Sequence, residues 1–151
     1  MDTIFKLHLF ATLFMTGLIW FVQIVHYPLM GSVGSDFFSA YESKHTFQTT
    51  LVVMPVMLLE LFTGFALVFG RGSQFSLMGS LEISMILLGL IWASTFFLQV
   101  PLHQQLVNGF DTAAHQKLVN SNWIRTVLWS ARAILLLFVV RTAASGSVFS
   151  Q

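Results

Sequence analysis

Four long apolar runs limit what this chain can fold into. They cover approximately residues 9–30, 51–70, 77–102 and 123–141. Each is close to the roughly 20 residues that a helix needs to cross the hydrocarbon core of a bilayer. The runs are continuous, whereas the strands of a membrane barrel alternate apolar and polar residues. The sequence therefore predicts an all-α fold, an integral membrane four-helix bundle.

The first run is predicted to be a retained span rather than a signal peptide. Lys6 precedes it, as a basic residue would in a secretory signal. However, its apolar stretch is longer than the about 7–15 residues of a signal-peptide core, and no small-residue cleavage site follows it. We therefore count it as the first helix of the bundle.

The low content of charged residues agrees with a membrane location. Only 9% of the 151 residues are charged and 56% are hydrophobic, whereas soluble domains carry roughly 25% charged residues. The mean hydropathy is +0.79. The absence of cysteine excludes disulfides, thiolate metal sites and thiol redox chemistry. The net charge of +1 gives no reason to expect nucleic acid as a partner.

Breaks rich in glycine, serine and asparagine separate the predicted helices, at 31–35, 70–73 and 108–109. We expect one transmembrane domain over residues 1–142, with helices at approximately 3–30, 36–69, 76–107 and 111–142. Residues 143–151 are expected to form a flexible tail. The second and fourth helices start before their apolar runs, so both should extend beyond the bilayer. Pro55 and Pro101 are expected to kink their helices without ending them.

A short motif recurs and favours two repeated helical hairpins. Gly-Leu-Ile-Trp at 17–20 returns at 89–92, and a Pro-Leu pair and a histidine-containing stretch follow each copy. Two hairpins related by an axis along the membrane normal would place both termini on one side. Chance matching between apolar segments is the alternative. Basic residues divide equally between the two sides, so cytoplasmic termini are a hypothesis that the positive-inside rule does not decide.

Four of the five histidines are expected at one end of the bundle, one from each helix. They are His26, His45, His103 and His115. Each lies within a few turns of a loop on the same side, so their depths should agree to about one or two helical turns. Imidazoles at one level of a bundle can bind haem or a transition metal such as iron, copper or zinc. We predict these four as cofactor-binding residues and regard His8, on the other side, as unrelated to them.

Two carboxylates share a helical face with two of these histidines. Glu42 lies three residues before His45, and Asp111 lies four residues before His115. We predict Glu42 and Asp111 as further metal ligands or as partners that orient the imidazoles. The set differs from that of di-iron bundles, in which two helices carry Glu-x-x-His and the other two each carry a glutamate. In the alternative interpretation, the histidines anchor the bundle at the headgroups, Glu42 pairs with a lysine, and Asp111 caps its helix.

Two charged residues fall deep within the apolar spans. Glu60 lies 15 residues after His45 and Arg132 lies 17 residues after His115, which puts the two at a similar depth. A lone charge there costs about 2.5–3.5 kcal/mol on insertion scales, so such groups normally face inward and pair. We predict a buried ion pair, Glu60–Arg132, which either forms a polar floor beneath a cavity or fixes the helix register. Arg125, nearer the end of its span, is expected to reach the headgroups.

Two stretches carry a family resemblance, Val-His-Tyr-Pro-Leu at 25–29 and Pro-Leu-His-Gln-Gln at 101–105. With these stretches, its size and its number of helices, the chain resembles small four-helix bacterial membrane proteins, to which the anthrone-oxygenase-like group and the histidine-bearing protoporphyrinogen oxidase group are similar. The resemblance covers the architecture of nearly the whole chain. It implies redox chemistry on an apolar substrate in a bacterial inner membrane, and it carries over no catalytic residue.

The sequence supports three functional hypotheses. The leading one is a membrane oxidoreductase, or a protein that binds a redox cofactor, with a metal or haem at the histidine end and an apolar small molecule as substrate. The second is a small transporter or proton-coupled carrier subunit, which with only four helices would need to form a homo-oligomer. The third is a structural or assembly subunit. The lipid bilayer is a partner in all three.

Overall fold

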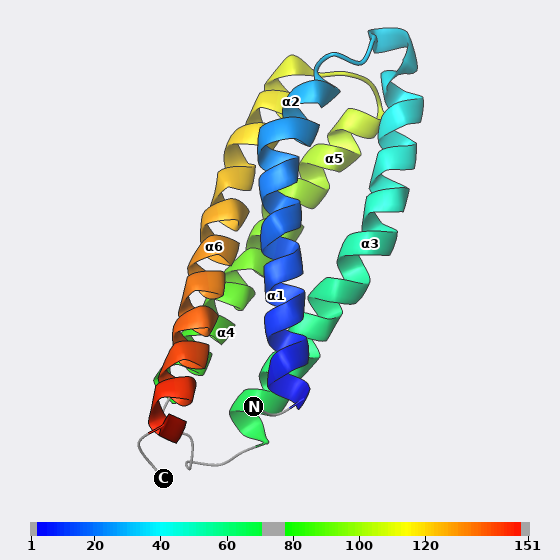
Figure 1. Ribbon diagram of the computed structural model, residues 1–151. Helices are drawn as coiled ribbons and strands as arrows, with labels where there is room; N and C mark the ends of the chain where they lie inside the picture. Colours follow the sequence, from blue (N-terminus) through cyan, green and yellow to red (C-terminus); the bar gives the residue numbers. More distant parts are fainter. Residues whose placement is uncertain (1–2, 71–77, 149–151) are drawn as a thin grey trace.

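The structure, a computed structural model, describes residues 3–70 and 78–148. These residues form four long helical rods that pack side by side (Figure 1). The rods are, in order, α1–η1–α2 (Thr3–Phe21, Val22–His26, Tyr27–Met30), α3 (Ser35–Phe69), α4–η3–α5 (Met78–Ser94, Thr95–Gln99, Val100–Val107) and α6 (Thr112–Val148). Each rod contains a segment long and apolar enough to cross a membrane. The predicted all-α four-helix bundle is confirmed.

The rods alternate in direction, as Figure 1 shows by the colour sequence along the chain. The start of α1 and the end of α6 lie at one end of the bundle. The two short connections, α2 to α3 and α5 to α6, lie at the opposite end, which we call the loop end (residues 31–34 and 108–111). Gly109, in the second connection, has a φ of +142°, a conformation that side chains rarely allow.

The helix ends agree closely with the predicted ones except at the C-terminus. α3 and α6 each begin within one residue of the expected position; α4 is described from Met78 on, and its expected start at 76 lies outside the described residues. The side chain of Asp111 caps α6, because its Oδ1 accepts a hydrogen bond from the Ala114 N–H at 2.7 Å. α6 continues to Val148, so residues 143–148 are helical although they were expected in a flexible tail. Most of the predicted break at 70–73, like residues 149–151, lies outside the described residues.

Short π-helical segments precede two of the three prolines. η1 ends before Pro28 and η3 ends before Pro101, so each proline lies in the first turn of the next α-helix. A proline has no N–H to donate, and a local π turn lets neighbouring groups satisfy the carbonyl that loses its partner. Pro55, by contrast, lies inside α3, which is continuous. Both π segments closely follow the Gly-Leu-Ile-Trp motif, which gives the two hairpins a structural feature in common.

Apolar side chains cover the outside of the bundle as well as its interior. Phe97 and Ile134 are 79% and 70% exposed, which suits a surface in contact with lipid. Inside, three apolar clusters follow one another along the bundle. The cluster around Phe38 lies at the loop end, the cluster around Trp129 lies at mid-length, and the cluster around Leu136 lies toward the termini.

Candidate metal centre

Glu42, His45 and His103 come together near the loop end in an arrangement that could hold a metal ion. One potential ligand atom from each lies within 4.8 Å of the other two. Glu42 is fully buried, and the side chain of His103 is 15% exposed. The group offers two imidazoles and one carboxylate, a donor set found at iron(II) and zinc centres.

Helix geometry explains why these three side chains meet. Glu42 and His45 are three residues apart on α3 and therefore lie on one helical face. They belong to the part of α3 that precedes its apolar run. His103 lies on α5, two residues after Pro101. The wider turns of η3 rotate α5 relative to α4, so this π segment helps to set which face of the third rod is turned toward α3.

A chain of hydrogen bonds connects this group to a buried arginine. Arg125 donates from Nη2 to the Tyr27 hydroxyl at 3.2 Å. The Tyr27 hydroxyl lies 3.0 Å from His103 Nε2. His103 Nδ1 in turn lies 2.5 Å from Glu42 Oε1. A guanidinium only donates and a carboxylate only accepts, so every bond is satisfied when Tyr27 donates to Nε2 and Nδ1–H donates to Glu42. These hydrogen bonds connect the positive guanidinium of Arg125 to the negative carboxylate of Glu42 through a neutral phenol and a neutral imidazole.

The second oxygen of Glu42 has no such partner. Glu42 Oε2 is buried and accepts no hydrogen bond from any of the described residues. A buried polar atom without a partner costs about 1–3 kcal/mol, and more when the group is charged. Native structures rarely leave such an atom unsatisfied, and a missing ion or water is a common explanation. The orphaned oxygen belongs to the same carboxylate that contributes to the metal-binding group.

His45 is held at one ring nitrogen, while the other makes no hydrogen bond within the described residues. His45 Nδ1 lies 3.0 Å from His26 Nε2 and 3.1 Å from Thr49 Oγ1. The rings of His26 and His45 lie with centroids 4.5 Å apart. Contacts at Nδ1 orient the imidazole and leave Nε2 available to bind a metal. The structure thus brings His26, His45 and His103 together, with His26 as a neighbour of the three-residue group rather than a member of it.

The two other predicted ligands, His115 and Asp111, make different contacts. His115 Nε2 lies 2.8 Å from the carbonyl oxygen of Tyr27 and therefore donates to it. This bond ties the start of α6 to α2 at the loop end. Asp111 caps α6, which is the structural alternative described above. Neither residue belongs to the group that could hold a metal.

Two residues of the site, Tyr27 and Arg125, are not among the predicted ligands. Arg125 was expected to extend to the headgroups, but it is only 7% exposed and points into the bundle. Asn122, one turn earlier on α6, accepts two of its hydrogen bonds at Oδ1 (2.9 and 2.5 Å). Gln23 Oε1 in turn accepts from Asn122 Nδ2 at 2.9 Å. The signal in the sequence was the polar spacing of Asn122 and Arg125 on one helical face, opposite Gln23 in the first span.

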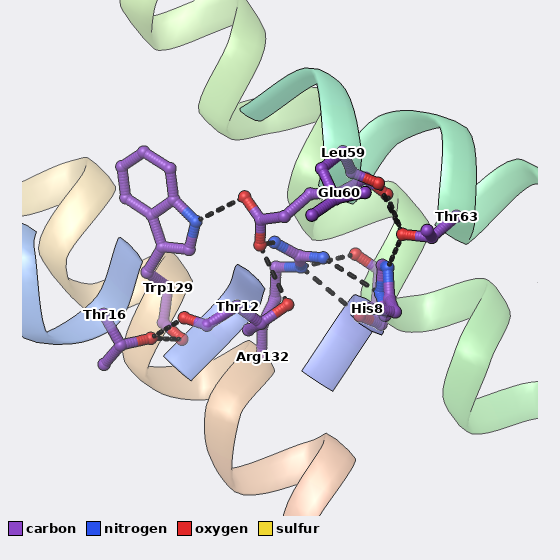
Figure 2. Close-up of polar contacts among 9 residues, drawn as sticks. His8, Thr12, Thr16, Leu59, Glu60, Thr63, Trp129 and Arg132 are labelled. Atoms are coloured by element: carbon purple, nitrogen blue, oxygen red, sulfur yellow. Dashed lines mark hydrogen bonds and ion pairs between the residues drawn. The ribbon is translucent and has the colours of Figure 1, made fainter. Parts of the chain in front are cut away.

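A second polar cluster lies deeper in the bundle, around Glu60 and Arg132 (Figure 2). Arg132 Nη1 donates to Glu60 Oε1 at 2.5 Å, and both side chains are 0% exposed. Glu60 also accepts from Thr12 at 2.8 Å and from the indole N–H of Trp129 at 3.1 Å. The structure therefore contains the ion pair that the matching depths predict, joining α3 to α6 and, through Thr12, to α1.

His8, which was not predicted to contact Glu60 or Arg132, belongs to this same cluster. Arg132 Nη2 lies 3.3 Å from His8 Nε2, and His8 Nδ1 lies 2.9 Å from Thr63 Oγ1. Arg132 also donates from Nε to the Ser84 carbonyl at 3.2 Å. Because the guanidinium donates to Nε2, the ring proton of a neutral His8 lies on Nδ1 and is donated to Thr63. Arg132 thus connects helices from all four rods.

A cavity of about 340 Å³ extends from the candidate metal centre to the middle of the bundle. His45, His103 and Tyr27 line it near the loop end, and Met57 and Trp129 line it at mid-length. Glu60 and Arg132 are not among its lining residues. Trp129 instead stands between the cavity and the ion pair, so the pair does not form an open polar floor. This arrangement favours the interpretation that the pair holds the helices in register.

No protein-family model, curated protein or solved structure matches the chain.

Proposed function

We propose that the protein is a membrane oxidoreductase, or a protein that binds a redox metal, with its metal held by Glu42, His45 and His103 and with an apolar molecule as its substrate. The unpartnered Oε2 of Glu42 carries the proposal. A buried carboxylate oxygen with no hydrogen bond, beside two imidazoles, is an arrangement that a divalent cation would complete. The resemblance to redox-active membrane groups described above supports the same chemistry.

Iron is the metal that this donor set favours among iron, copper and zinc. Two histidines and one carboxylate with open coordination positions are typical of non-haem iron(II) enzymes, although zinc also binds such a set. When bound, iron would supply one-electron exchange with oxygen or with the substrate. The donor set offers no argument for haem.

The chain's own residues have three tasks in this proposal. Glu42, His45 and His103 hold the metal. Tyr27 orients His103: with a metal bound at Nδ1 in place of the proton donated to Glu42, the ring proton would lie on Nε2 and be donated to the Tyr27 hydroxyl, which Arg125 holds in place. The cavity beside the histidines excludes water and holds an apolar molecule within reach of the metal. The exposed residues of its lining are all uncharged: Thr50, Met54, Phe96, Val100 and Gln104.

Metal analysis of protein purified gently in detergent tests the proposal. We expect about one iron per chain after anaerobic loading, and an optical or electron paramagnetic resonance signal that changes on oxidation. His45→Gln and Glu42→Gln should bind the metal at least about tenfold more weakly. His115→Gln is the matched control, because His115 lies at the same end but outside the group, and it should bind the metal as the unmodified protein does.

The other outcomes separate the competing functions. Absence of metal after purification, with no binding of iron, copper or zinc on reconstitution, would refute the metal centre. Binding of zinc alone would refute the redox function. A carrier function would be favoured instead if ion flux into liposomes depended on Glu60 in metal-free protein.

A further inference from the structure

The cavity beside the candidate metal centre is lined by all four rods and is mainly apolar. Aromatic and thioether side chains form much of its wall, among them Trp92, Phe96, Trp129 and Met57. An apolar cavity of about 150 Å³ already binds benzene. At about 340 Å³, this one is large enough for a molecule with two or three fused rings.

The cavity opens sideways, between α3 and the η3–α5 segment. Met54, on α3, lines the cavity and is 37% exposed. Across from it, Phe96 and Val100 line the cavity and are 52% and 38% exposed. All three belong to segments long and apolar enough to cross the membrane. A molecule that reaches the cavity by this route therefore comes from the lipid rather than from water.

One buried polar atom of the wall has no hydrogen-bond partner among the described residues. The indole Nε1–H of Trp92 is buried and makes no hydrogen bond to any of the described residues. Buried tryptophan N–H groups normally have an acceptor. Gln99, a buried amide of the wall, already bonds to Ser94 and Ser121. Because Trp92 lines the cavity, a rotation of its side chain would turn this N–H toward an acceptor bound there.

We propose that this cavity binds a lipid-soluble ring compound that bears a carbonyl group, which enters between α3 and η3–α5 and accepts a hydrogen bond from Trp92. The apolar walls and the volume of the cavity favour a ligand with fused rings. The unpartnered N–H of Trp92 favours a carbonyl group on that ligand, and the lateral opening favours a molecule dissolved in the membrane. The inference rests on the proposed function, because a ligand bound here lies next to His45 and His103 and would be the substrate of the metal centre.

The first test compares two probes on unmodified, metal-free protein in lipid nanodiscs. Menadione is a two-ring compound with two carbonyls, and 2-methylnaphthalene is its hydrocarbon counterpart. Because the chain has no cysteine, menadione cannot attach to a thiol. Binding is measured as the amount retained by protein-containing nanodiscs in excess of empty ones. We expect about one menadione per chain, bound about fivefold more tightly than the hydrocarbon, as one added hydrogen bond would give.

Two pairs of variants locate the bound probe. Trp92→Phe should reduce menadione affinity about fivefold and leave the hydrocarbon unaffected. Trp123→Phe is its control, because Trp123 does not line the cavity. Thr50→Phe adds a ring at an exposed lining position of α3 and should weaken binding of both probes at least tenfold. Leu51→Phe, one residue on and outside the lining, should not change either.

Each result bears on the proposal separately from the metal centre. No excess binding of either probe would refute the cavity as a ligand site. Equal affinities for both probes in the unmodified protein would refute the role of Trp92, whether or not the variants fold. Unchanged binding in Thr50→Phe would refute the lateral route. The binding tests use metal-free protein and do not depend on the metal analysis. If the protein binds menadione but proves unable to bind any metal, this inference stands and only the proposed redox function is refuted.

Discussion

Replacing Arg132 with leucine should be among the most destabilising single changes in this protein. The guanidinium is completely buried and bonds to Glu60, Ser84 and His8. Removing one partner of a buried ion pair costs about 3–5 kcal/mol, because the other charge stays buried without compensation. At roughly 2–4 °C per kcal/mol for a chain of this size, the melting temperature should fall on the order of 10 °C.

The double substitution isolates the contribution of the pair itself. Glu60→Gln removes the charge but keeps an oxygen that can accept from Thr12 or Trp129. On its own it leaves Arg132 uncompensated, so it should also destabilise. Once Arg132 is leucine, however, the same change removes a charge that is already unpaired and should recover part of the loss.

Thermal unfolding in detergent, followed by circular dichroism for the four proteins of this cycle, measures the coupling. We expect the double variant to lose less free energy of unfolding than the sum of the losses of the two single variants, by about 1–3 kcal/mol. Losses that simply add would mean that the two side chains stabilise the bundle independently. The reasoning from the shared depth of Glu60 and Arg132 would then be refuted.

Four further substitutions test other contacts. Gly64→Ala should destabilise by about 1–3 kcal/mol, because its Cβ would clash with the Met85 sulfur and lie 3.1 Å from a His8 ring carbon. Gly17→Ala is the control: its Cβ would have open space, and it should stabilise by up to about 1 kcal/mol in the same melts. Tyr27→Phe breaks the link between Arg125 and the imidazole of the metal group and should weaken metal binding about tenfold in a competition titration, with little change in melting temperature. Asp111→Ala should cost about 1 kcal/mol through loss of the helix cap without changing metal content; a loss of metal would show that Asp111 is a ligand after all.

The architecture was predictable because lipid imposes a simple rule on sequence. A span must be apolar over its full length, so the four runs located the helices to within a few residues. The same rule made Glu60 and Arg132 conspicuous, since two opposite charges at one depth have few other ways to be accommodated. His8 escaped notice because a histidine near the start of a span has an easier explanation at the interface.

The candidate site was only partly predictable, for a different physical reason. The spacing of Glu42 and His45 on one helix indicated a shared face, and the structure places both in the metal-binding group. Spacing on one helix, however, does not say which residues of another helix face it. Tyr27 and Arg125 resemble ordinary interface anchors in sequence, and only the packing of α2 against α6 turns them inward. The same limit applied to His115, whose contact is with a backbone carbonyl.

The π segments have a consequence for how the bundle tolerates insertions and deletions. Each residue of an α-helix advances the chain by about 100° around its axis. A π turn holds one residue more than an α turn, so η1 and η3 each act as a one-residue insertion absorbed within a continuous rod. Deleting a single residue from η3 would restore an α-helical phase and rotate everything after it, His103 included, by roughly a quarter of a turn. The helix would survive and still span the membrane, yet His103 would face away from Glu42. The third rod therefore has two helical phases. The phase before η3 packs α4 against α6, and the phase after η3 turns α5 toward α3.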